Sequence, residues 1–189
     1  SPIISVPSFD ACNSSISSSS IAGAGLRRSL EIVARHVPLT LHEVPSGTKA
    51  YDWTVPPEWN IRGASIETMD GRRVVDFADH NLHVVQYSQP IDRVVSGDEL
   101  QSHLHSMPDR PDWIPYRTSY YQEDWGFCLT QRRRDALDQD RYRVRIDAEL
   151  KRGHLTYGEL VLPGRRPEEV LISAHSCHPS LANDNLSGM

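Results

Sequence analysis

The sequence lacks most features that mark secreted or membrane-spanning proteins. It has only three cysteines, Cys12, Cys128 and Cys177, which are widely spaced. An odd number of scattered cysteines predicts no disulfide framework and favours a reducing compartment. No apolar run approaches the roughly 20 residues that a membrane span needs. Residues 1–10 have neither the basic start nor the apolar core of a signal peptide. We therefore expect a cytoplasmic protein that does not bind a membrane.

Positive charge is also in short supply. The chain has 20 Lys and Arg against 25 Asp and Glu, which gives a net charge of −5. This balance argues against a nucleic-acid surface. The one basic run, Arg132–Arg134, is followed at once by Asp135, so it predicts a solvated helix face rather than a phosphate-binding patch. We therefore do not expect nucleic acid as a partner.

Composition divides the 189 residues into three regions. Residues 1–23 contain a serine-rich tract at 13–20 and predict a flexible N-terminal segment. Residues 48–130 contain all four tryptophans and five of the seven tyrosines, and they predict a β-rich module. We expect this module to be inserted into an α/β domain formed by residues 24–47 and 131–189.

Apolar periodicity predicts the individual elements. A helical stripe runs over 25–37 and is ended by Pro38. Strands are predicted at 39–44, 60–67, 73–77, 83–87, 142–150 and 154–162. The tight connection Lys151–Gly153 predicts that the last two of these form an antiparallel hairpin. The apolar run Val170–Ala174 predicts a further, buried strand.

Metal-binding side chains follow directly after that run. His175, Cys177, His178 and Asp184 lie within ten positions. Open α/β sheets bind their ligands at the carboxyl ends of strands, and imidazole with carboxylate is a usual donor set for hydrolytic zinc. A strand end capped by polar residues is the alternative without a metal. A catalytic pair of Cys177 and His178 is disfavoured, because the side chains of adjacent residues diverge.

The spacing restricts which donors can meet. Residues three apart on an extended strand point to opposite faces, so His175 and His178 cannot both reach one ion unless the chain turns. Pro179 biases His178 away from helix, and we expect the chain to leave the strand there. One histidine would then be the ligand and the other would support it. Asp184, in an Asn/Asp-rich stretch that suits a helix entry, can bridge two cations.

The segment 173–188 resembles the metal-binding signature of a bacterial family of aminopeptidase-like proteins in the zinc-aminopeptidase clan. The resemblance extends over about residues 24–189 and is also carried by segments 43–60, 81–85, 113–116, 119–121 and 125–128. It implies an α/β fold, a phosphorylase/hydrolase-like mixed-sheet sandwich, with the β-rich module inserted. The chain would carry the N-terminal part of that sandwich.

The resemblance also implies a site with one or two zinc ions. A histidine at the strand end binds one metal, and Asp184 matches the aspartate that bridges two. The clan usually has His-x-Asp here, whereas this chain has Cys177 in the place of that aspartate. We favour His178 as the ligand, with His175 as the alternative. Supporting positions around them are Cys177, Asn183 and Asn185.

The other functional groups of the clan normally come later in sequence. They are a general base, a further acidic ligand and a last histidine. We therefore expect the general base beyond residue 189 and expect this chain to be a fragment that is inactive alone. The implied reaction is hydrolysis of a peptide or small amide bond by metal-activated water. The alternatives are a hydrolase of a small conjugate and a non-catalytic binding protein with a degenerate metal site.

The remaining aromatic and histidine residues predict packing more than chemistry. Most Trp and Tyr side chains of the module are expected in its core. Asp52, Trp53, Glu58 and Trp59 are candidates for the border of a substrate cleft, and His80, His83, His103 and His105 are expected to be packing or surface residues. A homo-oligomer is compatible with the sequence, which does not fix the oligomeric state.

Overall fold

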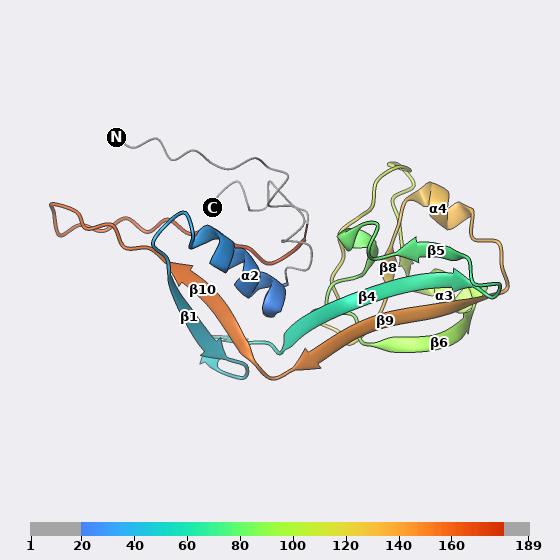
Figure 1. The fold of residues 1–189 in the computed structure, drawn as a ribbon, viewed down its shortest axis with the longest axis horizontal. Coiled ribbons are helices and arrows are strands. Elements are labelled where there is room, and N and C mark those ends of the chain that lie inside the picture. Colours follow the sequence, from blue (N-terminus) through green and yellow to red (C-terminus); the bar gives the residue numbers. More distant parts are fainter. Residues whose placement is uncertain (1–19, 180–189) are drawn as a thin grey trace. The chain divides into compact units, whose positions relative to one another are not determined.

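The computed structural model describes residues 20–179, which form two compact units (Figure 1). The first unit contains the described residues up to Glu58 and those from Arg152 onward, and the second is Trp59–Lys151. The described chain is mixed α/β with several small sheets and more strand than helix. None of the helices in residues 20–179 is long and apolar enough to cross a bilayer.

The first unit is built on a pair of strands that are far apart in sequence. Strand β1 (Thr40–Pro45) pairs antiparallel with β10 (His154–Glu159), from Thr40 opposite Glu159 to Pro45 opposite His154. Helix α2 (Ala24–Val33) lies against β10. Its stripe of apolar residues buries Leu26 and Leu30. A small hairpin of β2 (Lys49–Ala50) and β3 (Trp53–Thr54) follows β1.

The second unit contains a four-stranded sheet with the strand order β5-β4-β9-β6. Its strands are β4 (Glu58–Thr68), β5 (Arg73–Asp76), β6 (Ile91–Ser96) and β9 (Arg141–Lys151). Along β9, Tyr142, Val144 and Ile146 are buried and alternate with exposed arginines. This period of two turns one face of the sheet toward the core and leaves the other in water.

Short elements cover the buried face of this sheet. They are η1 (Asn81–His83), α3 (Gly97–Ser102), β7 (Leu104–His105), β8 (Phe127–Cys128) and α4 (Gln131–Asp135). The side chain of Ser96 caps α3 by accepting from the Glu99 amide at 3.1 Å, and Thr130 caps α4 in the same way. Phe127 and Leu100 are completely buried, so the core of the second unit lies between these elements and the sheet.

The predicted module boundaries, 48–130, differ from those of the second unit. The hairpin β2–β3 belongs to the first unit, and β9 belongs to the second. The reason is hydrogen bonding, because β9 has β4 on one side and β6 on the other. In the first unit, Ser20 and Ala22 fall inside the predicted flexible segment and are fully buried. Residues 1–19 lie outside the described residues.

The predicted hairpin between 142–150 and 154–162 is wrong. Both strands exist, but β9 and β10 lie in different sheets. Both edges of β9 are already paired, so β10 bonds to β1 instead. The predicted strand at 83–87 is also not formed as a strand. That segment contains the end of η1 and two isolated bridges, at Val84 and Gln86.

The predicted buried strand Val170–Ala174 is not present. Residues 160–179 contain no helix or strand, and Val170, Leu171 and Ile172 are 89%, 91% and 85% exposed. A buried strand needs neighbours that accept its hydrogen bonds and cover its faces. Among the described residues, β1 and β10 pair only with each other, so the run has no sheet to join.

Arg134 on α4 is expected to stabilise the second unit. Its guanidinium donates to Gln101 Oε1 at 2.8 Å, Gln101 O at 3.0 Å, Leu104 O at 3.0 Å and Ser106 Oγ at 3.2 Å. Arg134→Lys keeps the charge but loses this fork, so we expect urea unfolding of the second unit to require about 1–3 kcal/mol less free energy. Arg132→Lys, at an exposed pair with Asp112, is the matched control and should leave unfolding unchanged. Equal effects of the two substitutions would contradict this assignment.

Candidate metal centre

Three predicted site residues come together in the first unit. The ligand atoms of His175, Cys177 and His178 all lie within 4.8 Å of one another. The imidazole rings of the two histidines are 5.9 Å apart and nearly perpendicular, at 81°. His175 is exposed, whereas Cys177 and His178 are half-buried. No other group of three or more such side chains in the described part of the chain has this geometry.

The local backbone explains why both histidines reach the cluster. The chain is not in a strand here, and it bends at His178 and turns at buried Pro179. Alternation in an extended chain places His175 and Cys177 on one side, and the bend returns His178 to the same side. The sequence required a turn for this to happen, and the turn is present. Which histidine binds a metal stays a prediction.

The remaining predicted site residues lie outside the described residues. These are Asp184, the proposed bridging ligand, and the supporting residues Asn183 and Asn185. The described part of the cluster therefore offers two imidazole nitrogens and one sulfur. Nitrogen and sulfur donors are those that zinc prefers, so the residues present fit that ion.

The other described cysteine differs in its surroundings. Cys128 is completely buried in the second unit, and burial raises the pKa of its thiol to about 12. A metal ligand must be the thiolate, so Cys128 is unsuited to that role at neutral pH. Of the two described cysteines, only Cys177 belongs to a group of three or more potential metal ligands.

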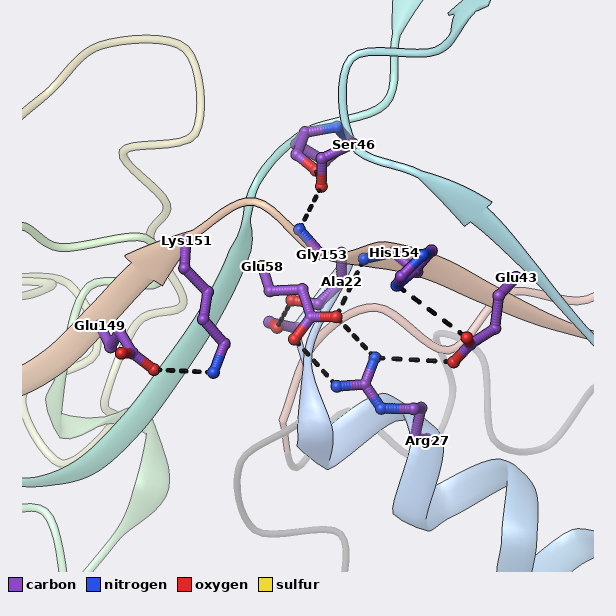
Figure 2. Close-up of polar contacts among 11 residues, drawn as sticks. Ala22, Arg27, Glu43, Ser46, Glu58, Glu149, Lys151, Gly153 and His154 are labelled. Atoms are coloured by element: carbon purple, nitrogen blue, oxygen red, sulfur yellow. Dashed lines mark hydrogen bonds and ion pairs between the residues drawn. The ribbon is translucent and has the colours of Figure 1, made fainter.

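A buried ion pair holds the first unit together (Figure 2). Glu58 is only 3% exposed, and its carboxylate accepts two hydrogen bonds from Arg27, at 2.7 and 2.8 Å. It also accepts from the amide of His154 at 2.9 Å. The hydrogen bond with Glu58 is the main cause of a raised pKa of Arg27. This carboxylate therefore links α2, the beginning of β4 and the beginning of β10.

The peptide around Gly153 supports the same network. The amide of Gly153 donates to Ser46 Oγ at 3.1 Å, and its carbonyl accepts from the Ser46 amide at 2.8 Å. Ser46 Oγ in turn donates to Pro56 O at 2.7 Å. Glu58, a candidate for the cleft border, is thus positioned as a structural residue. Asp52 is exposed at the tip of the β2–β3 hairpin, and Trp53 in β3 is half-buried.

The aromatic residues of the second unit pack mostly in its core. Trp59 is 4% exposed, donates to Ser88 O at 3.0 Å and stacks on buried Tyr87. Trp113 and Tyr121 are exceptions, at 58% and 92% exposed. The guanidinium of Arg110 lies 4.9 Å from the ring centre of Trp113.

The histidines of the second unit form local packing contacts. His83 is buried, with Nδ1 2.7 Å from Cys128 O and Nε2 3.1 Å from the guanidinium of Arg133. Burial is the main cause of the lowered pKa of His83. The pKa of His80 and that of His105 are also lowered by burial. His103 stacks on Trp125 with the ring centres 3.8 Å apart. None of these four joins a metal-binding group in the described residues.

Sequence comparison finds a family model that matches the second unit. Residues 58–149 match a family model described as "Domain of unknown function (DUF2172)". The second unit matches DUF2172. The match begins and ends within two residues of the structural boundaries, Trp59 and Lys151, which the composition of the chain did not locate.

Two relatives extend the comparison to the first unit. A Clostridium acetobutylicum protein named "Putative polysaccharide biosynthesis protein with aminopeptidase-like domain" is 51% identical over 170 residues, which are 90% of this chain and 39% of that protein. A crystal structure of a putative peptidase from the same organism is 47% identical, with a TM-score of 0.88 over 95% of this chain and 44% of that chain. The chain thus spans less than half the length of each.

The sequence did not reveal the ion pair of Arg27 and Glu58. The two residues are 31 positions apart, so no local pattern in the sequence links them. The available signal was the position of Glu58 between Pro57 and Trp59, an acidic residue in an apolar setting. Such a residue is almost never buried unless it is paired.

Proposed function

We propose that this chain is part of a zinc-dependent, peptidase-like hydrolase whose metal binds at His178, with His175 and Asp184 as further ligands. The proposal is carried by the convergence of His175, Cys177 and His178 to within 4.8 Å. Imidazole nitrogen and cysteine sulfur are donors that zinc prefers, so this group is suited to hold that ion.

The names of the relatives support the reaction class. One is named as having an aminopeptidase-like domain and the other as a peptidase. The resemblance in the metal-binding segment adds the zinc-aminopeptidase clan and its phosphorylase/hydrolase-like sandwich.

The residues of this chain would have separate roles. Neutral imidazoles of His175 and His178 would donate to the ion, and the carboxylate of Asp184 would bridge two ions or neutralise one. Bound zinc supplies a water of lowered pKa and polarises a carbonyl group. His175 is the exposed member of the cluster. We propose the N-terminal residue of a peptide, or a small amide, as the substrate.

Metal content tests the proposal. The full-length protein that contains this chain, purified without chelator and supplied with zinc, is expected to retain one or two ions. His178→Ala and Asp184→Ala should each lose bound zinc. The amount of zinc that His175→Ala retains shows whether His175 is a ligand or only supports His178. His36→Ala is the matched control, because His36 is exposed and outside the cluster.

Absence of bound zinc in the unsubstituted protein would overturn the proposal. It would instead favour a non-catalytic binding protein with a degenerate metal site. The observation behind that second candidate is Cys177, which stands where the clan has an aspartate. Retention of zinc in all three cluster variants would equally contradict the assignment, because the ion would then be bound elsewhere.

A further inference from the structure

The thiol of Cys177 lies among the donor atoms of the cluster. Its Sγ is within 4.8 Å of a nitrogen on each histidine. A residue that only orients a ligating imidazole lies behind it and bonds to the ring nitrogen that points away from the metal. The sulfur, in contrast, is grouped with both imidazoles. One of them precedes Cys177 in sequence and the other follows it.

We propose that Cys177 is itself a metal ligand, so that the cluster provides two nitrogens and one sulfur. This inference rests on the proposed function, because it assumes that the cluster binds a metal. It differs from the role that the family resemblance implies. There the residue two positions after His175 supports the imidazole and does not bind the metal.

The distances allow direct binding after a small movement. Zinc binds sulfur at about 2.3 Å and nitrogen at about 2.0–2.1 Å, so donors of a tetrahedral site are roughly 3.3–3.6 Å apart. The donor atoms lie within 4.8 Å of one another, so they must approach by at most about 1.2–1.5 Å. Residues 160–178 form no strand or helix, so no ladder of backbone hydrogen bonds resists this movement.

A sulfur ligand would change the chemistry of the site. Thiolate is soft, so it selects zinc over magnesium, calcium or manganese, which prefer oxygen. It also brings a negative charge directly to the ion, which neutral imidazole does not. The site would thus discriminate among metals through Cys177 even where its other ligands are common to many ions.

Cobalt(II) alone is the probe for this ligand. Cobalt(II) has visible d–d bands in a tetrahedral site and a near-ultraviolet charge-transfer band only if a thiolate binds it. The metal-free full-length protein, kept reduced without added thiols, is titrated with cobalt(II). We expect both kinds of band in the unsubstituted protein and in Cys12→Ser, and we expect Cys177→Ser to lose the charge-transfer band.

Affinity provides the second readout. Removal of a supporting residue typically weakens metal binding roughly 10–100-fold, so Cys177→Ser should weaken it by more than about 100-fold if a direct bond is lost. Cys177→His, which restores a donor, should recover much of that loss without recovering the charge-transfer band. Circular dichroism of each variant shows whether the fold is retained.

The outcomes separate this inference from the proposed function. Visible d–d bands with no charge-transfer band in the unsubstituted protein would overturn the role of Cys177 and leave the histidine site in place. A charge-transfer band that persists in Cys177→Ser would overturn it too, because another thiolate would be responsible. Failure of the unsubstituted protein to bind cobalt or zinc would overturn both.

Discussion

Substitution of Glu58 by Gln is expected to destabilise the first unit by about 2–4 kcal/mol. The carboxylate is 3% exposed and accepts both forked bonds from Arg27 and the amide of His154. Glutamine preserves the shape but removes the charge and one acceptor, which leaves a partly buried guanidinium without its counter-ion. Hydrogen exchange of the β1 and β10 amides under increasing urea would measure the loss in the unit concerned.

Glu43→Gln is the matched control for this experiment. Glu43 lies 4.0 Å from the same guanidinium, but its side chain is 48% exposed. Charge pairs in such positions contribute little, because water screens them. We therefore expect a much smaller change from Glu43→Gln. If the two substitutions were equally costly, net charge around Arg27 would matter and the buried geometry of Glu58 would not.

Gly153→Ala is expected to be comparably damaging, at about 2–4 kcal/mol. A Cβ at this position would lie 2.6 Å from Cγ of Glu58 and closer still to its carboxyl group. The carboxyl group cannot move aside cheaply, because Arg27 and the His154 amide hold it. Gly164→Ala is the control, since an added Cβ there meets only ordinary contacts. Urea unfolding, again followed by hydrogen exchange of β10, compares them.

A double-mutant cycle tests the cause of this effect. Glu58→Ala removes the atoms that the new Cβ would strike, so Gly153→Ala should cost less than about 1 kcal/mol in that background. Gly153 has an ordinary backbone conformation, so no strain of its own backbone is expected to remain. If Gly153→Ala were equally destabilising in the Glu58→Ala background, the clash with Glu58 would not be the cause. The contact between Ser46 and Gly153 would then be the source of the effect.

The sequence was informative about individual strands but not about their partners. The alternation of Val144, Ile146 and Ala148 predicted β9, because burial of one sheet face imposes a period of two. The sequence did not predict the pairing of β9. A short connection to β10 suggests a hairpin, even where other strands pair with both edges of β9. The partners of β9 are residues 58–68 and 91–96, which nothing local to β9 identifies.

Residue types marked the candidate site in the sequence, but they did not predict its surroundings. The grouping of His175, Cys177 and His178 followed from their closeness in sequence and the expected turn at Pro179. The strand before them was predicted from apolar content alone. That content measures whether a run favours burial, but burial also requires a surface to bury it, and residues 20–179 do not provide one.

The pairing of β1 with β10 sets an order of events during synthesis. Residues 40–45 leave the ribosome long before residues 154–159, by roughly ten seconds at about 5–20 residues per second. All strands of the four-stranded sheet are complete once Lys151 has emerged, before β1 can meet its partner. Prior folding of that unit would shorten the flexible loop between β1 and β10 and so reduce the entropy lost on closure. The second unit would thus fold before the first, although the first unit begins earlier in the chain.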